Sequence, residues 1–409
     1  MAPIILAMAT RVESPPATRS ILALAAGVAL MQLAVASGTT VASLFTAEAA
    51  GDGWGGVPNS ASVLGTAAGA LWLSAYMSGH GRRRGLRLGY GVSALGAALA
   101  VVSIDRGSVP FLLLAMVMLG AGNASAQLSR YAAAEVADPN RRGLALGAVV
   151  WAGTVGAVLG PALISPAASL GSRLDLDPLA GIFVVGLVVT SIAAVVIGAM
   201  RRTAVSSSSG APRRPPFDLL RLPRARVALV AMITGQLTMV AVMTMTPLHI
   251  HHHGHGLARV GFVISAHTLG MFALSPLSGW LTDRLGSMAV IFGGFGTLAI
   301  SLGLAIVSPG PGSVALPIAL FLLGYGWNLC LVGGSRLLAG HGDPAVEARV
   351  QGLVDALVWA TSALATLASG PIFATGGYRV LSGVAGVIVA GAAVVLARRR
   401  PLPAPHSAL

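Results

Sequence analysis

Sulfur and imidazole side chains recur at a four-residue spacing in two neighbouring apolar stretches. The first stretch carries Met239 and Met243, and the second carries His267 and Met271. Residues at i and i+4 share one face of a helix, so each pair would point its side chains to the same side. Thioether and imidazole ligands select soft metals, above all Cu(I), whereas Mg, Ca and Mn prefer oxygen. The spacing favours a soft-metal site, although packing alone also explains individual methionines.

The two pairs are expected at matching depth, because a short loop joins stretches that run in opposite directions. Counting from that loop puts Met243 level with His267 and Met239 level with Met271. The loop is also rich in histidine, and a histidine-rich tract has a metal-binding composition, although a solvated turn would also contain one. We assign metal capture at the outer mouth to His249, His251, His252, His253 and His255.

The elements that must position these residues are membrane-spanning helices. The chain has 409 residues, of which 55% are hydrophobic and 10% are charged, whereas a soluble domain carries roughly 25% charged residues. Apolar stretches of about 20 residues, the length that crosses a bilayer, recur from Ile21 to Leu396. We therefore predict an all-α membrane protein with twelve transmembrane helices in two pseudo-symmetric six-helix bundles.

The expected helices follow from breaks at Gly, Pro and clusters of charge. Their approximate ranges are 20–46, 57–78, 87–104, 109–135, 144–168, 178–200, 226–248, 257–281, 288–307, 315–338, 350–373 and 380–397. Two tails and a linker complete the organisation. We expect a cytoplasmic tail at 1–18, bundles at 19–200 and 227–397, a basic, Ser- and Pro-rich cytoplasmic linker at 201–226, and a cytoplasmic tail at 398–409.

The basic residues indicate membrane topology. All 26 are arginine, and the formal net charge is +13. With both termini in the cytoplasm, twenty arginines fall inside and four fall outside, which is a strong positive-inside bias. This distribution argues against nucleic-acid binding. Because lysine is absent, the chain also lacks the Lys of a nucleotide-binding P-loop, and the lone Cys330 excludes an intramolecular disulfide.

The two halves repeat local patterns, as a tandem duplication would. Ser129-Arg130 before Asp138-Pro139 matches Ser335-Arg336 before Asp343-Pro344. We expect Arg130 and Arg336 near the cytoplasmic ends of their helices. There they would form salt bridges at an inner gate, with Glu135 and Asp355 on nearby segments.

One loop carries a more specific pattern, Gly279-Trp-Leu-Thr-Asp283-Arg284-Leu-Gly286. This pattern, together with the six-plus-six arrangement and basic central linker, resembles the major facilitator superfamily and its G-x-x-x-D-R-x-G signature. The resemblance implies an inner-gate role for Gly279, Asp283, Arg284 and Gly286. In the first half, Ser78 stands where the Asp belongs.

A second motif is Gly156-Ala-Val-Leu-Gly160-Pro161, which resembles the G-x-x-x-G-P motif of antiporters in that superfamily. Its terminal Gly pair is absent here. Small residues at this spacing let helices approach closely, and Pro bends a helix. Generic helix packing explains the motif about as well as antiport does.

The pairs M-x-x-x-M and H-x-x-x-M resemble those of CcoA-like copper importers, which are bacterial members of the same superfamily. The resemblance implies that Met239, Met243, His267 and Met271 bind copper, and that copper enters across the cytoplasmic (inner) membrane by alternating access. It also implies a cytoplasmic copper acceptor. Copper would be the cargo of a transporter, and we expect a monomer with no prosthetic group, no enzymatic activity and no nucleic-acid partner.

Two other functions remain open. One is transport of an organic solute, either proton-coupled drug efflux or riboflavin uptake, because the same branch is thought to include riboflavin importers. The other is a membrane metal receptor that binds copper without moving it.

Overall fold

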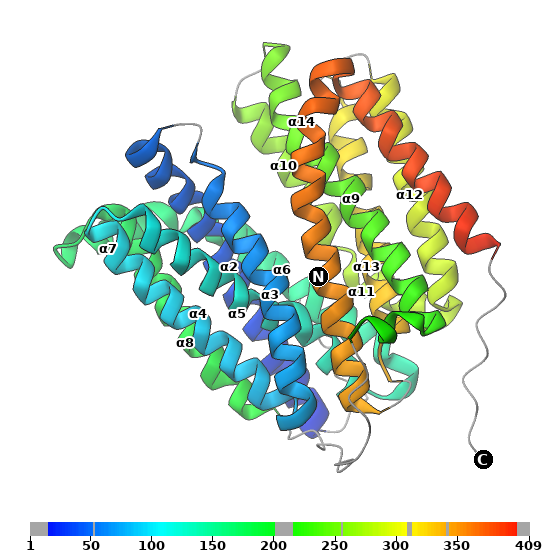
Figure 1. The fold of residues 1–409 in the computed structure, drawn as a ribbon, viewed down its shortest axis with the longest axis horizontal. Helices are drawn as coiled ribbons and strands as arrows, with labels where there is room; N and C mark the ends of the chain where they lie inside the picture. Colours follow the sequence, from blue (N-terminus) through cyan, green and yellow to red (C-terminus); the bar gives the residue numbers. More distant parts are fainter. Residues whose placement is uncertain are drawn as a thin grey trace. The chain divides into compact units, whose positions relative to one another are not determined.

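The protein is all-α over the residues described by the computed structural model, which are 15–51, 54–200, 216–254, 257–308, 313–340 and 343–398. Figure 1 traces the helices in chain order, from α2 in blue to α14 in orange and red. The first-half helices are α2 Pro15–Ala50, α3 Val57–His80, α4 Arg82–Asp105, α5 Val109–Val136, α6 Arg142–Ala162, α7 Ile164–Arg173 and α8 Gly181–Val196. The second-half helices are α9 Pro223–His252, α10 Leu257–Phe272, α11 Ser275–Leu285, α12 Ser287–Val307, α13 Ala315–Leu337 and α14 Pro344–Ala397.

The helices confirm the expected fold class and differ from the expected spans in two places. The predicted helix 144–168 is divided into α6 and α7 just after Pro161, because proline lacks the N–H that continues a helix. The predicted helix 257–281 is likewise divided into α10 and α11 before Pro276. The last two predicted helices, 350–373 and 380–397, both lie within α14, on either side of the non-helical Gly377 with φ 67° and ψ −167°.

Two equivalent glycines make the tight turns between consecutive helices. Gly81 separates α3 from α4 with φ 82° and ψ 156°, and Gly286 separates α11 from α12 with φ 83° and ψ 156°. Positive φ is costly for residues with a side chain, so glycine is the natural residue at both turns. The shared backbone geometry matches the shared position of these glycines in the two halves of the sequence.

Ten segments among the described residues are long and apolar enough to cross a membrane. One of them is α14, whose 54 residues are interrupted at Gly377, so it has the length of two spans. The less apolar α3 is not among the ten, although its 24 residues suffice to span a bilayer.

The described helices form two compact units that do not coincide with the two halves of the sequence. The first unit holds the described residues within 1–139, 148–211 and 343–360. The second holds those within 140–147, 212–342 and 361–409. Each unit therefore contains a short segment from the other half: the start of α14 lies in the first unit, and the start of α6 lies in the second. Most of the expected tails and of the expected linker 201–226 lie outside the described residues, and α2 already begins at Pro15, within the expected tail 1–18.

Candidate transport site and helix clasps

His267 is the best-defined member of the expected metal site. Its side chain is 3% exposed, and its Nδ1 lies 2.9 Å from the main-chain oxygen of Leu320 on α13. A carbonyl oxygen can only accept, so Nδ1 carries the proton and Nε2 keeps a lone pair. Nε2 is buried and has no hydrogen-bond partner in the described part of the chain. A histidine held this way is arranged as metal-bound histidines commonly are.

Contacts with α13 give the depth of the methionines on α9. The two helices run in opposite directions, because Met232 packs against Gly334 while Gly235, further along α9, packs against Cys330 and Trp327. Met239 lies one helical turn beyond Gly235. Counted along α13, it is therefore about level with residue 326, and Met243 is about level with residue 322.

Contacts of α10 with the same helix give the depth of the second pair. His267 bonds to Leu320 of α13, and the main-chain oxygen of Met271 accepts a 2.7 Å hydrogen bond from Asn328. The main chain of Met271 also faces Gly324. Helices α10 and α13 thus run in the same direction. Met243 is therefore about level with His267, and Met239 is about level with Met271.

The four side chains lie at two adjacent levels, Met243 with His267 and Met239 with Met271. Met239 is 7% exposed and Met243 is half-buried on α9, while Met271 is half-buried on α10. The Nδ1 edge of His267 faces α13. No group of three His, Cys, Asp or Glu side chains in the described residues is placed to hold a metal ion. A metal at this level would therefore require the thioethers.

Three of the expected outer histidines line a cavity of about 700 Å³ at the end of α9 and the bend of α14. The ring of His249 stacks on Tyr378, with centroids 4.4 Å apart and an interplanar angle of 6°. His252 faces Phe373 at 6.1 Å, and Nδ1 of His253 lies 2.8 Å from the main-chain oxygen of His249. Their rings thus stack and hydrogen-bond within an aromatic pocket. The side chain of His251 and the whole of His255 lie outside the described residues.

The motif from Gly279 to Gly286 contributes Asp283 to what we call the second clasp, in which this carboxylate meets the main-chain N–H groups of Gly143 and Leu144. Both N–H groups donate to the carboxylate at 2.8 Å, at the start of α6. A carboxylate at a helix N-terminus is favoured by the free N–H groups and the helix dipole. Arg336 lies 3.6 Å from the same carboxylate.

The other motif residues of this loop have distinct roles. Gly279 packs directly against the main chain of Gly143, where a side chain would collide with it. Gly286 makes the turn described above. Arg284 does not join the second clasp: its guanidinium lies 4.7 Å from the ring centroid of Trp280, one turn away on its own helix.

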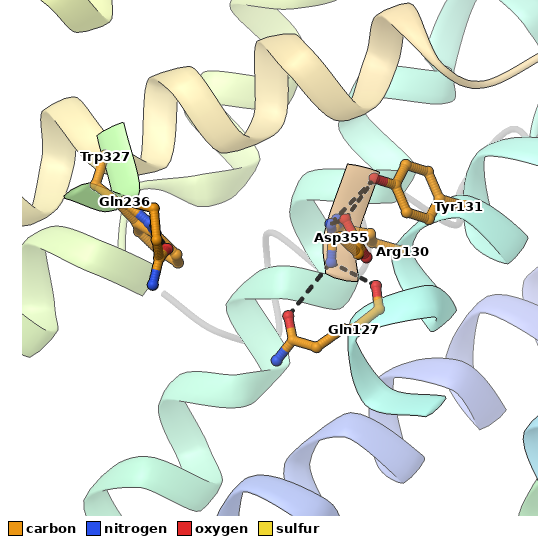
Figure 2. A network of polar contacts seen from close by, with 6 residues as sticks. All are labelled: Gln127, Arg130, Tyr131, Gln236, Trp327 and Asp355. Atoms are coloured by element: carbon orange, nitrogen blue, oxygen red, sulfur yellow. Dashed lines mark hydrogen bonds and ion pairs between the residues drawn. The ribbon is translucent and has the colours of Figure 1, made fainter. Parts of the chain in front are cut away.

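A second contact, which we call the first clasp, joins Arg130 and Tyr131 of the first half of the sequence to Asp355 of the second half. Figure 2 shows the guanidinium of Arg130 and the hydroxyl of Tyr131 meeting the Asp355 carboxylate. The two donors lie 2.6 Å and 2.9 Å from the same oxygen, Oδ1. The pair joins α5 to the start of α14, as the sequence suggested. Arg130 also donates to the main-chain oxygen of Gln127 at 2.5 Å.

Sequence reasoning missed the second ion pair of this region. Arg82 at the start of α4 donates to Glu135 on α5 and to the side-chain oxygen of Gln351 on α14. In the sequence, Arg82 stands within a run of arginines that reads as a topology signal. The 269 residues between Arg82 and Gln351 left no local pattern that could have paired them.

Another missed network lies inside the second unit. Gln236 on α9 accepts a 2.7 Å hydrogen bond from the indole N–H of Trp327 on α13 and donates at 2.7 Å to Ser362 on α14. Gln236 and Trp327 are also drawn in Figure 2. All three side chains are buried. This network fixes the side chains of three helices at one point.

The Gly-Pro motif packs α6 against α2. Gly156 lies against the main chain of Ala29, and a side chain at Gly160 would come within 3.1 Å of the main-chain oxygen of Leu33. Pro161 precedes the end of α6 by one residue. The motif therefore serves close helix approach and a bend in the first unit.

A bundle of membrane-length helices, with buried polar residues and clasps between segments from both halves, defines a polytopic membrane transporter rather than an enzyme. The model of the Major Facilitator Superfamily matches residues 20–258 and 250–408, and the chain belongs to that superfamily. It is thus a multi-pass membrane protein.

Two relatives illustrate the range of similar proteins. The uncharacterized MFS-type transporter YdeG of Bacillus subtilis is 33% identical over 367 residues, which is 87% of this chain and 85% of the relative. The riboflavin transporter RfnT of Brucella anthropi is 28% identical over 341 residues, which is 82% of this chain and 83% of the relative.

Solved structures agree on the fold. The human organic anion transporter MFSD10 superimposes with a TM-score of 0.76 at 17% identity, covering 94% of this chain and 100% of that one. The Escherichia coli fucose:proton symporter FucP does so with a TM-score of 0.72 at 14% identity, covering 94% and 100%. At these identities the likeness shows the fold alone.

Proposed function

We propose that this transporter imports copper by alternating access across the cytoplasmic membrane, with both termini inside. The observation that supports this cargo most directly is the buried Nε2 of His267, which bears a lone pair and no hydrogen bond. Twelve buried side-chain atoms of the described residues have no hydrogen bond, and Nε2 of His267 is the one imidazole nitrogen among them, which is an atom type that binds soft metals. Inverted or repeated halves that rock about a midplane site are the usual design of such carriers.

The neighbours of His267 favour a soft cation. Met243 lies at about the level of His267, and Met239 and Met271 lie about one turn away, so all four offer neutral sulfur or nitrogen ligands. Cu(I) accepts such ligands, whereas a hard cation would need oxygen. The copper would then pass to an acceptor in the cytoplasm, and the carrier would act as a monomer.

The histidine pocket at the end of α9 supports a collecting role in this scheme. Three imidazoles line one cavity of about 700 Å³, and neutral imidazole is a good copper ligand. Ions held there would be close to the end of the helix that carries Met239 and Met243. The clasps supply a gate, since each joins segments that belong to different halves of the sequence.

Copper uptake by cells tests this proposal. Cells producing the protein should accumulate radiolabelled copper. Met243→Leu and His267→Ala should each lower the initial rate of uptake about tenfold or more, because each removes one ligand, and a loss of about 1.4 kcal/mol in binding free energy corresponds to a factor of ten. Met239→Leu and Met271→Leu should act in the same direction. Met232→Leu is the matched control on α9, because Met232 packs against Gly334 outside this site. Equal uptake by all variants rules out this site.

The acidity of the medium gives a second readout. Thioethers stay neutral at all relevant pH values, so His267 is the one ligand of the four whose protonation competes with copper. Because His267 is buried and burial disfavours the charged imidazolium, uptake should stay level from about pH 8 to about pH 6 and fall only in more acid medium. A fall in acid that is as steep in His267→Ala as in the parent protein would contradict the assignment of His267 as a ligand.

Transport of an organic solute is the second candidate, and the similarity to the riboflavin transporter of Brucella anthropi favours riboflavin over a drug. The chain offers stacking rings and amide donors suited to a planar polar solute in His249, Tyr378, Trp327 and Gln236. Riboflavin uptake in a riboflavin-requiring strain separates the two candidates. Growth rescue that survives Met243→Leu and His267→Ala would favour the organic solute.

A further inference from the structure

A cavity of about 700 Å³ lies within the second compact unit, between the end of α9 and the bend of α14. Its lining residues fall within 245–253 and 370–379, so the two helices and the residue that follows α9 form its walls. Pockets for small organic molecules have volumes of about 300–1,000 Å³. The cavity is therefore large enough for such a molecule, and the copper proposal uses only its histidines.

Two contacts hold the bend of α14 against α9 beside this cavity. The hydroxyl groups of Tyr378 and Thr246 lie 2.9 Å apart, and the ring of His249 stacks on that of Tyr378. Two glycines leave the space open, because a side chain at Gly370 or Gly377 would meet no atom of the described residues within 4 Å. The cavity thus results from specific contacts between the helices and from missing side chains at two lining positions.

The charged part of the lining is basic. Arg379 carries the one full positive charge of the cavity, and none of the described lining residues is acidic. Arg379 is exposed and forms no ion pair within the described part of the chain. The arginines that do pair with carboxylates are Arg82, Arg130, Arg221 and Arg336. A guanidinium without such a partner offers its planar N–H groups to a carboxylate or a phosphate.

The other walls of the cavity are apolar and aromatic. Met245 and Leu248 line it from α9, and Phe373 and Ala374 line it from α14. The ring of His252 faces that of Phe373, with centroids 6.1 Å apart, and adds an N–H donor to this wall. Apolar surface beside a cation suits a molecule with a hydrophobic body and one negative group, and ring faces suit a flat body.

We propose that this cavity binds an organic anion whose body is flat and apolar and whose carboxylate or phosphate pairs with Arg379. The site is roughly 9 Å from the level of Met243 along α9, because each of the six positions from Met243 to His249 adds about 1.5 Å. A neutral imidazole has one nitrogen that donates and one that accepts, so the histidines can serve both an anion and copper collection. The proposal concerns this cavity alone and does not depend on the cargo that passes His267.

Binding of cinnamate to the full-length protein tests the proposal. Equilibrium dialysis of tritiated cinnamate against the protein in phosphatidylcholine nanodiscs gives the dissociation constant, and empty discs give the background. Cinnamamide has the same shape without the charge. It should compete about tenfold more weakly than cinnamate or worse, because hydrogen bonds between charged groups are the stronger kind. Equal competition by the acid and the amide would overturn the proposal.

Two variants remove the two features on which the site depends. Arg379→Gln removes the charge and Gly370→Leu fills the cavity, so each should weaken cinnamate binding about tenfold or more. Both variants should fold, because Arg379 is exposed and a side chain at Gly370 has room. The matched controls are Arg173→Gln, at an exposed arginine of α7, and Gly383→Leu, at an open position of α14 outside the cavity. Binding like that of the parent protein in both cavity variants, or equal weakening in the controls, would overturn the proposal.

The anion can come from solution or from the headgroup of a lipid, and the composition of the disc separates these sources. Phosphatidylglycerol supplies a lipid with a net negative phosphate, and the comparison is made at an ionic strength that screens the surface potential of the disc. Cinnamate binding that weakens in phosphatidylglycerol assigns the site to a lipid headgroup, and unchanged binding assigns it to a soluble anion. Both results support an anion site, whereas no saturable binding in either kind of disc would overturn it.

Discussion

Removing the charge of Asp283 should loosen the start of α6. In the second clasp the carboxylate accepts hydrogen bonds from Gly143 and Leu144, each at 2.8 Å. Asp283→Asn keeps the shape and one acceptor oxygen, but replaces two charge-assisted bonds with one neutral bond. A hydrogen bond to a charged group is worth about 1.5–3 kcal/mol, against about 1 kcal/mol for a neutral one. The attraction to the helix N-terminus adds about 0.3–1 kcal/mol.

At the low end of these ranges the net loss is about 2 kcal/mol, which corresponds to a roughly 30-fold increase in local opening. Hydrogen–deuterium exchange at the amides of Gly143 and Leu144 measures that opening, because exchange rates follow the free energy of local unfolding. We expect those amides to exchange about 30-fold faster in Asp283→Asn, while amides in α12 keep their rates.

Asp218→Asn provides the matched control. Asp218 forms an exposed pair with Arg221, 3.5 Å away on the same short helix, and exposed pairs contribute little. Exchange at α6 should be unchanged in this variant. If Asp283→Asn also left the Gly143 and Leu144 amides unchanged, the carboxylate would not be holding the helix start, and the second clasp as described would be wrong.

Two further substitutions test packing and buried hydrogen bonds. Gly156→Val should lower the melting temperature by several degrees, because a side chain there would strike the main chain of Ala29 and overpacking costs about 1–3 kcal/mol. Gly293→Val is the control, because nothing lies within 4 Å of a side chain at that position, and it should change the melting temperature little. Gln236→Leu should destabilise the protein by about 1–3 kcal/mol, because the indole N–H of Trp327 loses its acceptor. Thermal unfolding of the purified protein measures both, and equal stability of the two glycine variants would contradict the first.

The sequence predicted the membrane helices well because their signal is local. A run of about 20 apolar residues identifies a span wherever it occurs, and Gly286 and Gly81 mark the same turn in both halves. The interruptions near Pro161 and Pro276 were harder to foresee, since proline is tolerated in membrane helices when neighbours satisfy the freed groups.

The clasps depended on information that a single sequence does not contain. Salt bridges of Arg130 and Arg336, with Glu135 and Asp355 on nearby segments, were expected, but which acid pairs with which arginine was not. The contribution of Tyr131 and the bond from Arg82 to Gln351 link positions more than 200 residues apart. Their partners follow from how the helices pack, and no local spacing indicates them.

The side-chain directions at the expected metal site could not be predicted from the sequence either. The spacing of Met239, Met243, His267 and Met271 predicted a shared depth, and the contacts along α13 agree with it. The direction of each side chain depends on rotation about the helix axis and on the neighbouring helix. The hydrogen bond from His267 to Leu320 is one such feature, and no local pattern of residues indicates it.

Flux measured with the purified protein in liposomes tests the proposed cargo most directly. Vesicles containing the parent protein should take up Cu(I), supplied with a reductant, faster than vesicles containing the His267→Ala, Met243→Leu double variant, and neither should take up riboflavin. Binding of copper without flux would indicate a membrane receptor instead. Riboflavin uptake that is equal in both preparations, with no copper flux, would contradict the account.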